Sequence, residues 1–261
     1  MTPDLGPAVP PVLLLFDIDG TLVEPGASRS HLAAVHAAIR DVYGMPDPTA
    51  AGIRASGKTD LRIAAEILAA GGYTREHFRL HADRYCAAAA AQYETRCPAD
   101  LSGYVIDGIP ALLTGLAARA DVRLGLLTGN IRKIALRKLD AAGLAGFFSP
   151  AVGSWGCDAE DRIQLAPIAR ARAGAGGVSH PRERTMIIGD TPGDIACAHA
   201  DRIRCAAVTT GRYTADQLTA ADYVARDAAE LSAIIALELS SLLPAQPQTR
   251  AVGRPRGAGP G

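Results

Sequence analysis

Short, continuous apolar runs alternate with longer amphipathic stretches along most of this chain. The apolar runs are residues 12–16, 123–127, 185–188, 205–208 and, more weakly, 223–224. Because each run is short and uninterrupted, it is typical of a strand buried on both faces of a parallel sheet. Helical patterns fall between them, at residues 110–119, 131–142, 164–172, 192–200 and 227–242. Strand and helix in repetition predict an α/β fold with a doubly wound parallel sheet.

The interval between the first two predicted strands does not fit this alternation. A parallel crossover needs roughly a dozen residues, whereas residues 27–104 contain no convincing strand and carry helical patterns at 31–43, 59–70 and 75–92. We therefore predict an inserted, all-helical cap over residues 27–104, and a core domain made of residues 11–26 and 105–243. Residues 1–10 and 244–261 hold little that could enter a core and are expected to be disordered.

The composition narrows the classes of partner. The 27 basic and 27 acidic residues balance, so no basic surplus points to nucleic acid or an anionic membrane. Five scattered cysteines without a C-x-x-C pair favour free thiols over disulfides or a zinc site. No apolar stretch reaches the roughly 18 residues of a membrane span. We expect a cytoplasmic protein with a small-molecule partner, and the sequence leaves open whether it is a monomer or a weak dimer.

Acidic side chains follow two of the predicted strands. Asp17 and Asp19 come after the first strand, in FDIDGTL, and Asp190 follows the third, in GDTPGD. An open α/β sheet places its ligand site at these carboxyl ends. Asp17 is positioned to bind a metal and attack phosphorus, with Asp19 beside the leaving oxygen and Asp190 completing a Mg²⁺ site of hard oxygen ligands. An acidic turn is the alternative interpretation of Asp17 and Asp19 alone.

The second strand ends in Thr128, Gly129 and Asn130. A hydroxyl and free amides where a strand meets a helix form an anion site, so we interpret these residues as a phosphate grip; a simple helix cap is the alternative. Asp194 lies near the start of the helix after Asp190. We assign it an outer role at the metal site, although an acid there also matches the helix dipole.

The segments FDIDGTL, LLTGN and GDTPGDI, in this order, resemble the haloacid dehalogenase superfamily of phosphohydrolases. The helical insertion resembles the C1 cap of that superfamily, as in phosphoglycolate phosphatases and β-phosphoglucomutases. The resemblance covers roughly residues 11–240 and implies a Rossmann-like core and an aspartyl-phosphate on Asp17. It further implies Asp19 as general acid and base, Thr128 as phosphate binder, and a Mg²⁺ site formed by Asp17, the Asp19 backbone carbonyl, Asp190 and Asp194.

One position departs from the family pattern, which usually supplies a lysine before the third motif. No lysine follows Lys138 in this chain. Arg162 stands in that region and would neutralise the same charges. Lys133, near the start of the helix after Thr128, is the rival source of positive charge.

Residues 52–59, GIRASGKT, match the P-loop pattern letter for letter. A P-loop requires a buried strand immediately before it, whereas a turn-like segment precedes this one. We interpret it as a cap loop from which Arg54 or Lys58 faces the substrate; a solvated lysine at a helix start is the plainer alternative.

The leading function is Mg²⁺-dependent hydrolysis of a small phosphate monoester. A phosphoglucomutase-type phosphoryl transfer keeps the same carboxylates and stays open. The second carboxylate, Asp19, counts against carbon–halogen cleavage, which superfamily dehalogenases perform without it. A catalytically silent binding module and a P-loop nucleotide binder are the alternatives from other classes.

Overall fold

A computed structural model of the chain describes residues 9–242, except for the side chains of Ala50 and Ala51. The predicted disorder of residues 244–261, and of residues 1–8 within the N-terminal segment, lies outside this range. Pro10 is described, and its carbonyl accepts a hydrogen bond of 2.6 Å from Arg184 Nε.

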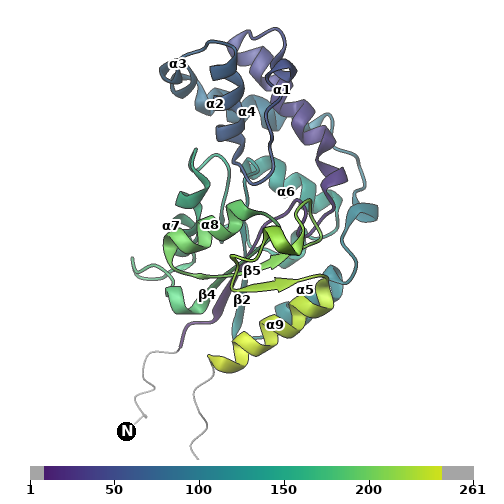
Figure 1. Cartoon of the computed structure of the whole chain (residues 1–261), viewed down its shortest axis with the longest axis vertical. Helices are drawn as coiled ribbons and strands as arrows, with labels where there is room; N and C mark the ends of the chain where they lie inside the picture. The colour runs from purple at the N-terminus through teal and green to yellow at the C-terminus, as the bar shows by residue number, and fades with distance from the viewer. Residues whose placement is uncertain (1–8, 243–261) are drawn as a thin grey trace, which may run out of the picture.

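Six parallel strands form one sheet in the order β3-β2-β1-β4-β5-β6 (Figure 1). This confirms the predicted α/β fold with a parallel sheet. The strands are β1 (Val12–Phe16), β2 (Val122–Leu127), β3 (Gly153–Ser154), β4 (Thr185–Gly189), β5 (Arg204–Val208) and β6 (Tyr223–Ala225). β3 was not predicted, because a two-residue strand with one glycine carries no apolar run.

Helices cover both faces of the sheet, and every residue of β1 is therefore buried, in agreement with its wholly apolar sequence. Alternate residues of a strand point to opposite faces. Val12, Leu14 and Phe16 pack in one cluster with α5, α6 and α9, whereas Leu13 and Leu15 pack in another with α7 and α8. These helices are α5 (Ile109–Ala117), α6 (Arg132–Ala141), α7 (Leu165–Ala173), α8 (Pro192–Asp201) and α9 (Ala228–Ser241).

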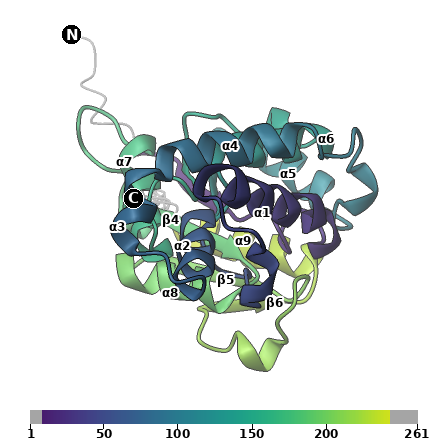
Figure 2. The same ribbon diagram turned by 90° about the horizontal axis from the view of Figure 1, so that it is seen from above.

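Four of the five α-helices between β1 and β2 lie over the carboxyl ends of the strands (Figures 1 and 2). We call them the helical insert: α1 (Arg29–Tyr43), α2 (Asp60–Ala70), α3 (Arg75–Leu80) and α4 (Ala82–Glu94). The insert has a hydrophobic cluster of its own, which also includes Ile134 of α6 and Ile131, the residue just before that helix. It is therefore packed against the core through α6 while keeping a separate interior.

The single helix predicted over residues 75–92 is wrong, because the chain leaves helical geometry at His81. There φ is −118°, which ends α3 and begins α4. The break lets Phe78 and Tyr85 approach Tyr43 from two helices, with ring centroids 6.2 and 6.4 Å away. Tertiary packing of aromatic rings therefore overrides a continuous helical pattern. None of the helices within residues 9–242 has the length and apolar character needed to cross a bilayer.

Candidate active site

The register of the sheet brings the predicted site residues to one edge. Phe16, the last residue of β1, lies beside Leu126 of β2 and Ile188 of β4. The residues that follow therefore leave the sheet side by side, and the Asp17 amide donates to the Ile188 carbonyl at 2.8 Å. Asp17, Thr128 and Asp190 gather at the carboxyl edge although more than a hundred residues separate the first two in sequence.

Three buried carboxylates form the centre of the site. Asp17, Asp190 and Asp194 each offer an oxygen within 4.8 Å of the others, and none is more than 5% exposed. Burial, with only partial relief from Arg162, raises the pKa of Asp17 to about 6. Burial together with the neighbouring acids raises the pKa of Asp190 to about 8. Negative charge is thus crowded at this point, and a cation would relieve it.

The residues present fit a Mg²⁺ ion. All three side chains supply hard carboxylate oxygens, which Mg²⁺ prefers. Asp17 Oδ1 is buried and has no hydrogen-bond partner within the described residues, which is unusual for a buried polar atom unless a ligand, either a metal or a substrate, satisfies it. The Asp19 carbonyl, the fourth expected ligand, accepts no backbone hydrogen bond in residues 9–242.

Two glycines make room for the Asp190 carboxylate. A Cβ at Gly20, where φ is +87°, would lie 2.3 Å from an Asp190 oxygen, and a Cβ at Gly211 would lie 1.7 Å from the same atom. Any side chain at either position would displace the carboxylate. The glycine of the FDIDGTL segment, Gly20, is therefore required because a larger residue would collide with the Asp190 carboxylate.

Arg162 lies beside the acid cluster, in the short 3-10 turn Arg162–Gln164 that precedes α7. Its Nη2 is 2.9 Å from Asp17 Oδ2 and also donates to Asp194 Oδ1. The side chain is only 7% exposed. Lys133, the rival in the sequence interpretation, is exposed on α6. Among the two candidates, the cation next to the nucleophile position is thus Arg162.

Besides its contact with Arg162, Asp194 bonds to Thr191, the N-cap residue of α8. Its Oδ2 accepts from the Thr191 amide at 3.0 Å and from the Thr191 hydroxyl at 2.7 Å, and these bonds form a capping box at the start of α8. The helix-cap and metal-site interpretations of Asp194 therefore do not exclude each other. The cap fixes the carboxylate whose other oxygen faces Arg162.

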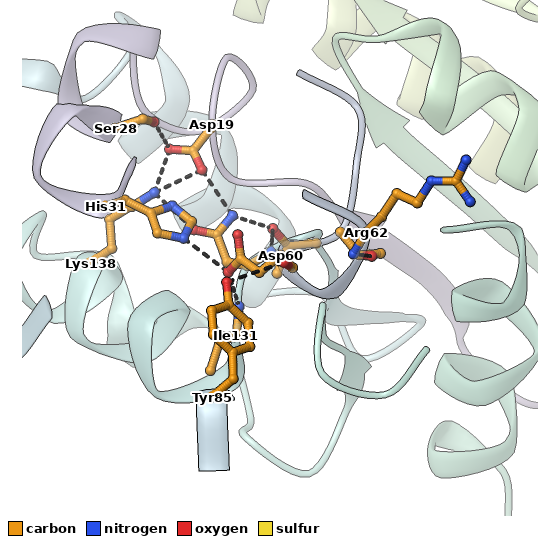
Figure 3. A network of polar contacts seen from close by, with 11 residues as sticks. Asp19, Ser28, His31, Asp60, Arg62, Tyr85, Ile131 and Lys138 are labelled. Carbon is orange, nitrogen blue, oxygen red and sulfur yellow. Dashed lines mark hydrogen bonds and ion pairs between the residues drawn. The ribbon is translucent and has the colours of Figure 1, made fainter. Parts of the chain in front are cut away.

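Asp19 is held by a group that the sequence interpretation missed. Lys138 Nζ lies 2.6 and 2.7 Å from the two Asp19 carboxylate oxygens, and the Ser28 hydroxyl and Asn130 Nδ2 donate to them at 2.6 and 2.9 Å (Figure 3). Burial alone would raise the pKa of Asp19, but the Lys138 ammonium, with His31 and Ser28, brings it below its usual range. Lys138 itself is fully buried.

A signal for Lys138 was present in the sequence. It occupies a helix position three residues after Ala135 and next to Leu139, and both of these are buried. A lysine on the apolar stripe of a helix is rarely buried unless it is paired. The partner, however, lies 119 residues away, so the pairing itself follows only from the fold.

The predicted phosphate grip is a loop rather than the first turn of α6. The Thr128 hydroxyl is fully buried and accepts from the Asn130 amide at 3.3 Å and from Asn130 Nδ2 at 2.8 Å. The Gly129 amide makes no hydrogen bond in the part of the chain that the structure describes. Asn130 thus joins Thr128 to Asp19, and the Gly129 amide is free to bind an anion.

The loop with the P-loop pattern belongs to the helical insert. A 3-10 turn, Pro48–Ala51, precedes it in place of a strand. Lys58 forms an ion pair of 2.5 Å with Glu66, whereas Arg54 is exposed and has no ion-pair partner among residues 9–242. Both residues line a cavity of about 630 Å³ that also contains Asp17, Asp19 and Asp190. The cavity therefore lies between the helical insert and the core.

Comparison with known proteins agrees with this arrangement. A family model described as haloacid dehalogenase-like hydrolase matches residues 12–200. "Probable phosphatase IndB" of Dickeya dadantii (strain 3937) is 28% identical over 211 residues, which are 80% of this chain and 86% of that protein.

Solved structures share the fold at low identity. A β-phosphoglucomutase from Clostridium difficile has a TM-score of 0.63 at 16% identity, covering 88% of this chain and 98% of that one. A predicted phosphoglycolate phosphatase from Haemophilus somnus 129pt has a TM-score of 0.57 at 18% identity, covering 88% of this chain and 100% of that one. At such identities these structures show likeness of fold alone.

Proposed function

The chain belongs to the haloacid dehalogenase-like hydrolases and is a phosphatase, and we propose that it hydrolyses a small phosphate monoester through a covalent phosphate on Asp17. One observation carries this proposal. Asp17 Oδ1 is buried and has no hydrogen-bond partner within the described residues, while Asp17 Oδ2 lies 2.9 Å from Arg162. One oxygen is thus oriented by a cation and the other is free to attack.

The proposed reaction has two steps. In the first, Asp17 Oδ1 attacks phosphorus, the bond to the ester oxygen breaks, and the leaving alcohol takes up a proton. In the second, water attacks the phosphorus of the aspartyl-phosphate and gives up a proton, which releases inorganic phosphate and restores the Asp17 carboxylate. Thr128 and the free Gly129 amide are proposed to hold the phosphoryl oxygens during both steps.

Asp19 is proposed to move the proton. Its contacts with Lys138 hold it as a carboxylate, which suits the second step, where a base takes a proton from water. The acid role in the first step requires that Asp19 carry a proton, and the contact with Lys138 disfavours this. We propose that Asp19 leaves Lys138 when it protonates the leaving alcohol.

The metal is proposed to be Mg²⁺, held by Asp17, Asp190, Asp194 and the Asp19 carbonyl. When bound, Mg²⁺ would offset the negative charge that the acids and the phosphoryl group bring together. Arg162, which contacts both Asp17 and Asp194, would share this task.

The cavity supports a finer proposal about the substrate. Its volume of about 630 Å³ falls within the range of roughly 300–1,000 Å³ that is usual for pockets enclosing drug-sized ligands. The helical insert lines it with apolar side chains from α1, α2 and the loop before α2. These are Leu32, Val35, Ile53 and Ile63. We propose a substrate with an apolar body that packs against this wall.

Three arginines line the same cavity, each from a different segment. Arg29 begins α1, Arg54 lies in the loop before α2, and Arg212 follows β5. All three are exposed, and none forms an ion pair with a carboxylate of residues 9–242. Lys58 is already paired with Glu66, which favours Arg54 over Lys58 as the substrate contact. Unpaired cations around the cavity suit a substrate with a second anionic group.

The test is a screen of phosphorylated metabolites and simple aryl phosphates, with released inorganic phosphate as readout, for the wild type and for Asp17→Asn. We expect phosphate release by the wild type and none by Asp17→Asn, because an amide is a far poorer nucleophile than a carboxylate. Wild-type turnover by the Asp17→Asn variant would falsify the assignment of the nucleophile. Isomerisation of a sugar phosphate with little phosphate released would indicate the mutase instead.

A further inference from the structure

A residue of the helical insert, Asp60, contacts the phosphate-binding loop of the core directly. Asp60 is the first residue of α2 yet is only 1% exposed. Its amide donates to the Gly129 carbonyl at 2.8 Å, and its Oδ2 accepts from the Ile131 amide at 2.7 Å (Figure 3). One residue of the insert therefore holds both ends of the tripeptide Gly129-Asn130-Ile131.

The carboxylate of Asp60 is not needed for its own helix. The Thr59 hydroxyl caps α2 by accepting from the Arg62 amide at 3.1 Å. α6 has the opposite arrangement, because its N-cap residue, Ile131, makes no side-chain cap. Asp60 accepts from the backbone amide of Ile131 itself, so its carboxylate lies at the N-terminus of α6, where a negative charge is stabilising.

This contact changes the expected phosphate site. The Ile131 amide is occupied by Asp60, so the start of α6 does not bind the anion through this group. The free amide in this loop is that of Gly129, the residue whose carbonyl accepts from the Asp60 amide. Asn130, whose Nδ2 reaches Thr128 and Asp19, is the central residue of the same tripeptide. The position of Asp60 thus determines how the loop presents its donors.

Close backbone packing makes the loop depend on the insert. A Cβ on Gly129 would lie 2.1 Å from the Lys58 carbonyl oxygen, so the insert backbone lies directly on Gly129. On the other side, the Gly156 amide donates to the Asn130 carbonyl at 2.8 Å. The loop is therefore held between the insert and the segment after β3.

Asp60 is itself fixed from several sides. His31 Nε2 lies 2.9 Å from Asp60 Oδ2, and the Tyr85 hydroxyl donates to the Asp60 carbonyl at 3.2 Å. The neighbouring Thr59 hydroxyl donates to the Glu160 carbonyl at 2.7 Å. These contacts join α1, α2 and α4 of the insert to the core at one point.

We propose that Asp60 is a positioning residue for the phosphoryl group: it orders the loop Thr128–Ile131 when the helical insert is docked, so that the phosphate grip is complete only in the docked state. This inference rests on the proposed function, because it assigns the loop to phosphate binding. Asp60 acts through the loop and does not itself contact the phosphate.

The experiment compares Asp60→Ala and Asp60→Asn with Asp227→Ala. Asp227 is the N-cap of α9 and accepts from the Ala229 and Glu230 amides at 2.9 Å, so its removal also uncaps a helix, away from the cavity lining. The readouts are kcat/KM for two unrelated phosphate esters, the inhibition constant of inorganic phosphate, and Tm.

We expect Asp60→Ala to lower kcat/KM by about tenfold to a hundredfold on both esters, the effect of misplacing a site by roughly 1 Å, and to weaken inhibition by inorganic phosphate. Asp60→Asn should recover most of the loss, because its amide oxygen can still accept from Ile131. Asp227→Ala should lower Tm while leaving kcat/KM and phosphate inhibition at wild-type values.

The inference is overturned if Asp60→Ala keeps wild-type kcat/KM and phosphate inhibition while it only loses Tm, as the control does. If Asp60→Ala does not fold, Asp60→Ser serves the same comparison, since serine suits a helix start but is too short to hold Ile131. Calorimetric binding of inorganic phosphate with Mg²⁺ separates the two proposals. A wild type that releases no phosphate from any ester refutes the proposed function, whereas unchanged phosphate affinity in Asp60→Ala refutes the role of Asp60.

Discussion

Replacing Arg162 by alanine removes the cation that lies beside the proposed nucleophile. Arg162 Nη2 contacts both Asp17, at 2.9 Å, and Asp194, and the side chain is 7% exposed. The substitution leaves Asp17, Asp190 and Asp194 buried together, with no basic partner in contact from the rest of residues 9–242. We expect a large loss of turnover together with a loss of stability.

The magnitude follows from the loss of one preorganised contact to developing charge. Such a contact contributes about 3 kcal/mol to the transition state, which corresponds to roughly a hundredfold in kcat. Removing one partner of a buried ion pair costs about 3–5 kcal/mol of stability, and bound Mg²⁺ should recover part of it. Because Arg162 opposes the rise in the pKa of Asp17 to about 6, its loss raises the pKa of Asp17 further in the metal-free protein.

The assay measures kcat and KM at saturating Mg²⁺, together with Tm, for Arg162→Ala, Arg162→Lys and Lys133→Ala. Arg162→Lys should retain part of the turnover, because an ammonium keeps the positive charge but lacks the rigid, planar donor geometry of the guanidinium. Lys133→Ala is the matched control, since Lys133 is exposed on α6. A folded Arg162→Ala variant with turnover within about threefold of the wild type would refute the reasoning, and a dead Lys133→Ala variant would place the required charge on α6.

Three further outcomes are expected. A chelator should abolish phosphate release and Mg²⁺ should restore it, while Ca²⁺ should substitute poorly because its larger, looser coordination misplaces the attacking oxygen; full activity after exhaustive chelation contradicts this. Lys138→Met should lower stability by about 3 kcal/mol, or roughly 6–12 °C in Tm, whereas Lys133→Met should not. The Lys138 contact lowers the pKa of Asp19, so its contribution to stability is present above the usual aspartate pKa and is lost as pH falls through the lowered pKa of Asp19. The Tm values of the wild type and of Lys138→Met should therefore become equal in acid. A Tm difference that stays constant down to that pH argues against the pairing. Arg54→Met should reduce the preference for 4-(carboxymethyl)phenyl phosphate over its uncharged amide, measured as the ratio of their kcat/KM values, by about tenfold. Arg40 lies outside the cavity lining, so an equal reduction in Arg40→Met would show that the effect is not specific.

Local patterns in the sequence were sufficient for the fold class and for most of the candidate acids. The apolar run at Val12–Phe16 forms β1 as predicted, because a strand with no polar position can only be buried on both faces of a sheet. Asp17 and Asp190 could be assigned to one site without coordinates, since parallel strands bring their carboxyl ends to a common edge. The roles assigned to them stay predictions until the variants are measured.

The pairings within the site were decided only by the tertiary structure. Asp19 meets Lys138 across 119 residues, and Asp60 meets Ile131 across 71. Neither pairing leaves a local signal of its partner. The position of Lys138 on the apolar stripe of α6 indicates burial but not which acid it meets, and an aspartate at a helix start, such as Asp60, is usually solvated. Periodicity determines which face of an element is buried, whereas the sheet register and the docking of the helical insert determine which buried charges meet.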